Sequence, residues 1–145
     1  MLVFFVVTYA VAALGGLATE VGPGSWYAGL QKASFNPPNW VFPVAWNLLY
    51  ATIALAGWLI WKRGERKALH WWAAQLVFNL AWSWIFFRGH AAVWALAEML
   101  VLWLLIATTV AKFWRIDTRA GALLLPYLAW VTFAITLNGA IVALN

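Results

Sequence analysis

Cysteine is absent from this 145-residue sequence, and charged residues are scarce. Without cysteine the chain has no disulfide framework, no thiol nucleophile and no cysteine-based zinc or iron–sulfur site. Only 9% of the residues are charged, against about a quarter in a soluble domain, and 66% are hydrophobic. A soluble domain of this length could not bury so much apolar surface, because small domains leave a large part of their area in water. Lipid is therefore the expected solvent for most of the chain.

Five apolar segments are long enough to cross a bilayer, which takes roughly 20 mostly apolar residues per helix. Together they use nearly the whole sequence. We therefore predict an all-α fold, a single transmembrane domain over residues 1–145 built as a five-helix bundle. The predicted helices cover residues 2–19, 41–61, 68–87, 91–111 and 120–144.

The basic residues indicate how this bundle is oriented. Seven of the nine Lys and Arg lie in two short segments between apolar runs: Lys62, Arg63, Arg66, Lys67, Lys112, Arg115 and Arg119. By the positive-inside rule, this integral multi-pass membrane protein has its N-terminus inside and its C-terminus outside. Such clusters do not form a stripe that follows phosphates, so nucleic acid is not an expected partner.

The connection between the first two helices, Glu20–Trp40, is longer than the others and rich in proline and aromatic residues. Two interpretations fit it. It folds as a lid over one end of the bundle, or its Trp26 and Tyr27 anchor it in the lipid headgroup layer. Asn39 is predicted to cap the second helix.

Polar residues inside the third and fourth predicted helices mark faces that turn inward. Gln75, Asn79 and Trp82 share one face, which either bonds to neighbouring helices or lines a pocket. Trp94 and Glu98 are one turn apart on the fourth helix. An acid inside a span is either a functional group or a neutral structural one. We expect Glu98 to be buried and neutral, with its proton shared with a polar neighbour.

The second and fifth predicted helices each carry an aromatic residue beside small or polar neighbours. Trp46 and Tyr50 lie one turn apart, and Trp130, Ala134 and Leu137 follow one face. This combination suits a flat, apolar, aromatic ligand. His70 and His90, at opposite ends of the third helix, are about 30 Å apart along it and cannot share a metal ion, so no metal site is expected.

Three motifs, in order, carry a resemblance to a known family. They are Trp26-Tyr27-Ala28-Gly29-Leu30-Gln31-Lys32 with Asn36-Pro37-Pro38-Asn39-Trp40-Val41, then Gln75-Leu76-Val77-Phe78-Asn79-Leu80-Ala81-Trp82 followed by Ile85-Phe86-Phe87, then Pro126-Tyr127-Leu128-Ala129-Trp130 with Thr136-Leu137-Asn138. The chain resembles the translocator protein family (TspO/MBR), also called tryptophan-rich sensory proteins or peripheral-type benzodiazepine receptors.

The resemblance implies a five-helix membrane bundle, often a homodimer, that binds porphyrins such as protoporphyrin IX and haem, and benzodiazepine-type ligands. Porphyrin and haem would be ligands, with no required cofactor. The implied pocket lies beneath the loop between the first two helices. Its residues would be Trp46, Asn79, Trp82, Trp94, Trp130, Ala134 and Leu137, with Trp26 and Tyr27 in the lid. From the face pattern, Tyr50 and Glu98 complete the candidate set.

Three functions follow as expectations. The first is a membrane receptor, sensor or carrier for tetrapyrroles, acting in porphyrin handling or stress regulation in a bacterial-type membrane. The second is a light- or oxygen-dependent degradation of protoporphyrin, with Trp46 and Trp130 as candidate catalytic residues. The third is a structural membrane scaffold. Sterol-linked members carry a Tyr and a basic residue after the Leu-Asn of the fifth helix, and here Gly139 follows Asn138 instead, which argues against sterol binding.

Overall fold

A computed structural model describes every residue from Met1 to Asn145 and contains five long helices and no strand. A 3₁₀ turn, η1 (Tyr27–Gly29), lies in the first connection, and a π-helical segment, η2 (Trp84–Arg88), continues the third helix. The long helices are α1 (Leu2–Ala18), α2 (Val41–Lys62), α3 (Arg66–Ser83), α4 (Ala92–Ile116) and α5 (Thr118–Leu144). The predicted all-α fold class is confirmed.

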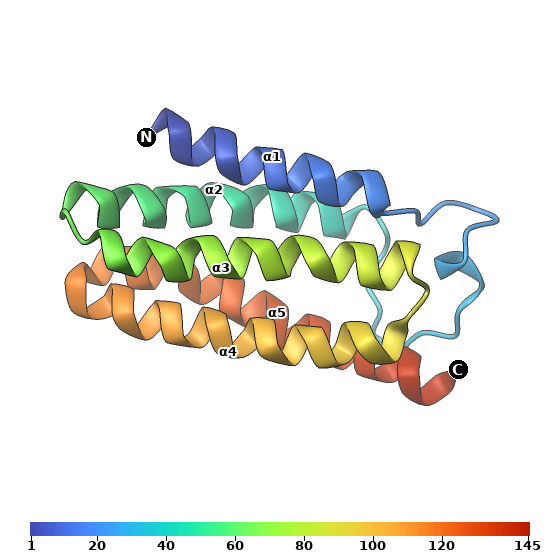
Figure 1. The fold of residues 1–145 in the computed structure, drawn as a ribbon. Coiled ribbons are helices and arrows are strands. Elements are labelled where there is room, and N and C mark those ends of the chain that lie inside the picture. Colours follow the sequence, from blue (N-terminus) through green and yellow to red (C-terminus); the bar gives the residue numbers. More distant parts are fainter.

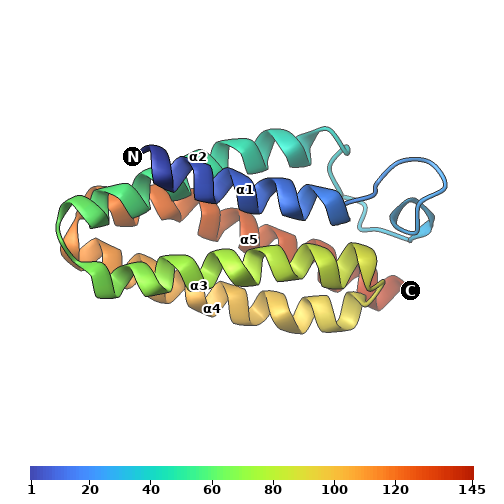
Figure 2. The ribbon, with the colours of Figure 1, turned by 45° about the horizontal axis from the view of Figure 1, so that its top comes forward.

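The helices lie side by side and alternate in direction (Figure 1). α5 packs against α2 and α4, and α1 lies on the outside against α2 and α3. The two basic turns, α2–α3 and α4–α5, lie at the same end as the N-terminus, and the C-terminus lies at the other end (Figures 1 and 2). Which end faces the inside of the cell stays a prediction from the positive-inside rule.

The outer surface of the bundle is suited to lipid. α2, α4 and α5 are long and apolar enough to cross a membrane, and α1 is a shorter apolar helix of 17 residues. Large apolar side chains point outward along the helices, among them Leu2, Leu48, Val77 and Leu104. Exposed apolar area on this scale is tolerated only when the surroundings are themselves apolar. The chain is therefore an integral membrane protein built as a five-helix bundle.

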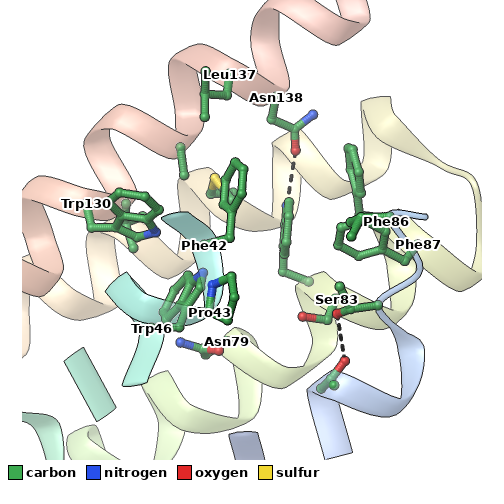
Figure 3. Close-up of a pocket in the computed structure, with 18 of the residues that line it drawn as sticks. Phe42, Pro43, Trp46, Asn79, Ser83, Phe86, Phe87, Trp130, Leu137 and Asn138 are labelled. Carbon is green, nitrogen blue, oxygen red and sulfur yellow. Dashed lines mark hydrogen bonds between the residues drawn. The ribbon is translucent and has the colours of Figure 1, made fainter. Parts of the chain in front are cut away.

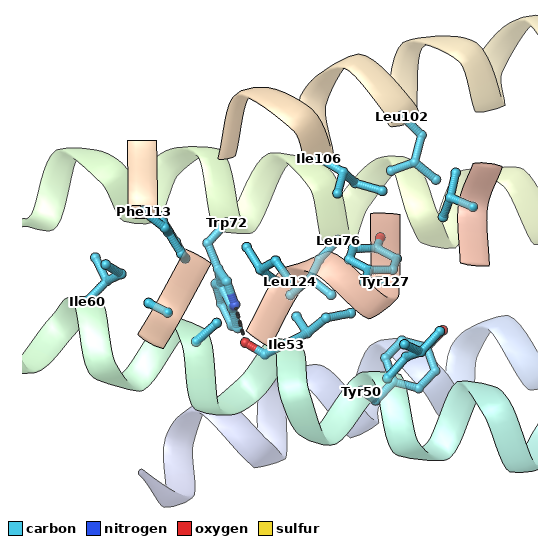
Figure 4. Close-up of a cluster of buried hydrophobic side chains, with 14 of the residues drawn as sticks. Tyr50, Ile53, Ile60, Trp72, Leu76, Leu102, Ile106, Phe113, Leu124 and Tyr127 are labelled. Carbon is cyan, nitrogen blue, oxygen red and sulfur yellow. Dashed lines mark hydrogen bonds between the residues drawn. The ribbon is translucent and has the colours of Figure 1, made fainter. Parts of the chain in front are cut away.

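The largest core cluster lies where α2, α3, α4 and α5 meet (Figure 4). The side chain of Trp72, on α3, packs against α2 in this cluster. Its indole N–H donates a hydrogen bond of 2.9 Å to the carbonyl oxygen of Ile53, so the polar tip of the ring is satisfied inside the bundle. Gly57 makes room for this ring, because a Cβ there would lie 2.7 Å from it. In the absence of water, such close packing holds membrane helices together.

Asp117 joins the two basic turns. Its buried carboxylate caps α5 by accepting a hydrogen bond from the backbone N–H of Arg119, and it accepts further bonds from the side chains of Arg119 and Arg63. The hydrogen bonds from Arg119, its charge and the bond from Arg63 lower the pKa of Asp117 from 3.8 to about 2. One carboxylate thus fixes the α4–α5 turn and ties it to the α2–α3 turn.

We expect Asp117→Ala to lower the free energy of unfolding by about 1 kcal/mol at neutral pH, the typical cost of a lost helix cap. A carboxyl whose pKa is depressed by folding stabilises the protein above its unfolded pKa and loses that effect as the pH falls through the folded pKa. The parent's advantage over Asp117→Asn, which can still cap α5, should therefore shrink from pH 4 towards pH 2. Melting temperatures in detergent over this range test the expectation, and a gap that does not vary with pH would contradict it.

The long connection folds over the end of the bundle near α3 and α4, as the lid interpretation predicts (Figure 1). Tyr27 is buried against Phe86 and Phe87 of η2. The predicted capping role of Asn39 is wrong. Its side-chain amide instead donates to the carbonyl oxygen of Val21, which joins the two ends of the loop, and α2 begins without a side-chain cap.

Candidate functional site

A cavity of about 440 Å³ lies under the loop and reaches between the helices (Figure 3). All five long helices, η2 and the loop contribute to its wall. Its size is within the range of small-molecule sites, and its lining is mostly apolar with a few polar groups, as is usual for such sites. Helical periodicity explains how separate helices converge on it, because residues one turn apart on each helix share the inward face.

Aromatic side chains from α2 and α5 form one wall of the cavity. The rings of Trp46 and Trp130 meet edge to face, with centroids 6.4 Å apart and an interplanar angle of 83°. Phe42 packs edge-on against Trp130, and Tyr50 lies next to Trp46. Figure 3 shows Trp46 and Trp130 facing the same space from their two helices. A planar ligand can meet indole surface from both helices here.

The wall opposite is formed by α3 and η2. Trp82 stacks on Phe86 with centroids 4.9 Å apart, and Phe87 packs edge-on against both rings. The adjacent Phe86 and Phe87 lie on the π-helical segment η2, and both line the cavity. Such π-helical turns are frequent at functional sites. The cavity is therefore a slot between two aromatic walls.

Buried polar groups form a chain of hydrogen bonds beside the cavity. The Tyr50 hydroxyl donates to the Asn79 side-chain oxygen at 3.2 Å, and the Asn79 amide donates to the Tyr127 hydroxyl at 2.9 Å. Tyr127 in turn donates to Gln75 at 2.7 Å. Both alternatives for the polar face of α3 are thus realised: Gln75 bonds between helices, and Asn79 bonds between helices while also lining the cavity.

Two further hydrogen bonds join the α3 side of the cavity to α4 and α5. The indole N–H of Trp82 donates to the side-chain oxygen of Asn138 at 3.1 Å, and the Asn138 amide donates to the carbonyl oxygen of Ala92. These bonds hold α3, α4 and α5 together at the lid end. Because they engage the amide and indole groups, the remaining attraction for a ligand is mainly apolar and aromatic.

Most of the predicted site residues meet at this cavity. Eight of them line it: Tyr27, Trp46, Tyr50, Asn79, Trp82, Trp130, Ala134 and Leu137. Trp26, Trp94 and Glu98 do not. Trp26 lies outside it, stacked parallel on His90 at 4.7 Å and edge-on against Phe86, where it fastens the lid.

Trp94 faces away from the cavity, so its predicted place in the pocket is wrong. The inward face of α4 consists of Ala95, Met99, Leu102 and Ile106, and Trp94 is 72% exposed. A separation of four residues shows that Trp94 and Glu98 lie on the same face of α4. It does not show whether that face points into the bundle. The buried Ala95, one residue along, is the position that packs beneath Tyr27 and Phe86.

Glu98 is correctly predicted to hold its carboxyl group away from solvent, but the expected polar partner is absent. Both carboxyl oxygens are buried and neither has a hydrogen-bond partner. The side chain lies at the border of the inward face of α4, beside Met99 and outside the cavity wall. A buried, unpaired polar group costs stability.

We therefore expect Glu98→Met to raise the free energy of unfolding by about 1 kcal/mol, because it replaces an unpaired carboxyl by an apolar side chain of similar length. Glu98→Gln, which leaves a polar group in the same place, should gain less. Unfolding in mixed detergent micelles measures both variants. Loss of stability in Glu98→Met would mean that the carboxyl has a favourable partner.

Several lining residues escaped the sequence prediction. Phe42, Ser83, Met99 and Leu102 carry no motif beyond ordinary helix periodicity. Phe86 and Phe87 had a signal, because two adjacent Phe residues follow the polar face of α3.

Comparison with known proteins assigns the chain. The model of the TspO/MBR family matches residues 4–144. The chain belongs to this family. It is 42% identical over 139 residues to the tryptophan-rich sensory protein of Cereibacter sphaeroides, which covers 93% of this chain and 88% of the relative.

Two other relatives agree. Protein CrtK of Rhodobacter capsulatus is 35% identical over 147 residues, covering 98% of this chain and 92% of the relative. The translocator protein of Homo sapiens is 40% identical over 119 residues, covering 78% of this chain and 70% of the relative. The resemblance carried by the three motifs is confirmed, and the chain is a TspO/MBR family protein of the membrane sensor and translocator type.

Proposed function

We propose that this TspO/MBR protein is a membrane sensor or carrier that binds planar tetrapyrroles, above all protoporphyrin IX, in the cavity under the lid. The observation that carries the proposal is the slot between the Trp46–Trp130 wall and the Trp82–Phe86 wall. Aromatic stacking rewards a large flat ligand, and each such contact contributes about 0.5–1.5 kcal/mol beyond area burial. Smaller benzodiazepine-type ligands would use the same walls.

Metal-free porphyrin suits the cavity better than haem. No histidine or cysteine is among the lining residues, so the usual nitrogen or thiolate ligand for haem iron is missing. The lining hydroxyls of Tyr50 and Tyr27 are already hydrogen-bonded to Asn79 and Asn36, which leaves the thioether of Met99 as the one lining side chain of a haem-ligating type without such a bond. Bound haem would therefore be held mainly by its ring. A homodimer stays a prediction of the family resemblance.

Titration with protoporphyrin IX in lipid nanodiscs, followed by the Soret band in darkness, tests the proposal. Saturable one-to-one binding is expected. We expect Trp46→Phe or Trp130→Phe to weaken it less than about tenfold, because phenyl retains part of the contact and one decade corresponds to 1.4 kcal/mol. Trp→Ala at both positions should weaken it more. Absence of saturable binding in the parent protein would instead favour a structural scaffold.

A second function, degradation of protoporphyrin driven by light or oxygen, is favoured by one observation. Trp46 and Trp130 are adjacent, and both line the cavity. Indole is more readily oxidised than phenyl, so the two Trp→Phe variants should lose a reaction routed through these rings while they keep binding. Illumination of the complex separates the functions: an intact Soret band indicates a sensor or carrier, and its loss with a new product indicates degradation.

A further inference from the structure

The wall of the cavity is not closed all round. Most lining residues are buried or half-buried, but five are exposed: Gly16, Thr19, Asn39, Pro43 and Asn47. Gly16 lies near the end of α1 and Thr19 just follows it, Pro43 and Asn47 lie on the first half of α2, and Asn39 just precedes α2. The exposed part of the wall is therefore confined to the edge between α1 and α2.

The packing of α1 explains this opening. Near its C-terminal end α1 rests on α3, where Gly15 is buried and a Cβ on it would lie 3.5 Å from the Ser83 hydroxyl. Towards its N-terminal end it rests on α2 instead, and the Tyr9 hydroxyl donates to the Asn47 carbonyl oxygen at 2.8 Å. The exposed lining residue Asn47 lies six residues beyond Val41, about 9 Å along α2, so the opening extends below the loop.

The rim of the opening offers little resistance to an apolar molecule. Gly16 has no side chain, and a Cβ built on it would meet nothing within 4 Å. The side-chain donors of the rim already have partners: Thr19 donates to the Gly15 carbonyl oxygen, Asn47 to that of Pro43, and Asn39 to that of Val21. Exposed large apolar side chains flank the rim on both helices, namely Leu14, Leu17, Val44 and Leu48. The α1–α2 edge of the bundle is therefore suited to contact with the hydrocarbon tails of the bilayer.

The lid end, by contrast, is fastened at several points. Trp26 is stacked on His90, and Tyr27 is buried against η2. Two hydrogen bonds join the Asn145 side chain to the backbone N–H and carbonyl of Gln31. Passage from water would require these contacts to break. At the α1–α2 edge the Asn39–Val21 bond lies at the loop and the Tyr9–Asn47 bond lies further down α1, and no described hydrogen bond joins the two helices between them.

We propose that the gap between α1 and α2 is a side portal, through which apolar planar ligands dissolved in the bilayer enter and leave the cavity while the lid stays closed. The identity of the ligand rests on the proposed function, but the route rests on the geometry of α1 and α2. Gly16 is the residue that keeps the portal open. A large side chain there would stand in the gap.

A test without any tetrapyrrole is possible because the chain has no cysteine. Ala134→Cys places a single thiol in the cavity wall, and its labelling by pyrene maleimide dissolved in the vesicle membrane reports entry from lipid. Adding Gly16→Phe should slow this labelling at least about tenfold, the effect of about 1.4 kcal/mol added to a barrier. Gly139→Phe is the matched control: this glycine of α5 also has open space beside it but does not line the cavity, so the rate should stay unchanged.

Two results would overturn the portal. One is equal labelling in Gly16→Phe and the control. The other is labelling from water by a charged, membrane-impermeant maleimide as fast as from lipid. Because no porphyrin is used, failure of the portal is distinguishable from failure of the proposed function, which shows only in the Soret titration.

The same route predicts the kinetics of protoporphyrin exchange. Gly16→Phe should slow both association and dissociation, whereas changing a residue that only contacts the ligand speeds dissociation. Joining Gln31→Cys to Asn145→Cys with a bis-maleimide fastens the lid and should leave both rates unchanged. If the fastened lid stops exchange while Gly16→Phe does not, ligands pass through the lid end and the side portal is refuted.

Discussion

Ala134→Trp should weaken the binding of protoporphyrin IX at least about 100-fold, equivalent to about 2.7 kcal/mol. Ala134 lies on the cavity wall one turn beyond Trp130, so an indole added there occupies the slot itself. Close-packed surroundings cannot move aside cheaply, because α5 is held against α3 and α4 by the Trp82–Asn138–Ala92 contacts. Soret titration in nanodiscs gives the affinity.

Ala143→Trp is the matched control for this change. It is the same Ala→Trp substitution on the same helix, at an exposed position near the end of α5 and outside the cavity. Tryptophan is well tolerated at membrane interfaces, so affinity should stay within about twofold of the parent. If Ala134→Trp binds as well as Ala143→Trp, the porphyrin does not occupy this slot and the proposed site is misplaced.

Tyr127→Phe should lower the free energy of unfolding by about 1–3 kcal/mol, a large effect for the loss of one atom. The hydroxyl is fully buried, donates to Gln75 and accepts from Asn79, so its removal leaves the Oε1 atom of Gln75 and the Nδ2 atom of Asn79 without a partner inside the membrane. Single hydrogen bonds in membrane proteins contribute about 0.6 kcal/mol on average, but here two amides lose a partner together. Unfolding in mixed micelles measures the loss.

Tyr9→Phe provides the comparison. Its hydroxyl donates one hydrogen bond to the Asn47 carbonyl at the exposed α1–α2 edge, where the loss should be well below that of Tyr127→Phe. Equal losses in the two variants would show that the buried chain of polar residues is no more important than a peripheral bond. A double variant, Tyr127→Phe with Gln75→Leu, should recover part of the stability, because it also removes one of the orphaned groups.

Composition alone established the class of this protein. A chain of this length with 9% charged and 66% hydrophobic residues cannot bury all of its apolar surface away from water. Its five apolar runs, separated by short basic or proline-rich segments, permit few arrangements other than a five-helix bundle. Helical periodicity also identified the inward faces of α2, α3 and α5. On those helices polar or small residues recur at a turn's spacing, so each face was marked by more than one residue, as at Gln75 and Asn79.

Only the tertiary structure decided which face of α4 points into the bundle and where α1 packs. On α4 the sequence shows only that Trp94 and Glu98 share a face, which does not set the rotation of the helix about its axis. In the structure Ala95 and Met99 face inward instead. The opening beside Gly16 depends on α1 leaning from α2 onto α3, through contacts between residues far apart in the chain such as Gly15 and Ser83. Local sequence fixes which residues share a helix face, whereas the rotation and tilt of a helix are set by the partners against which it packs.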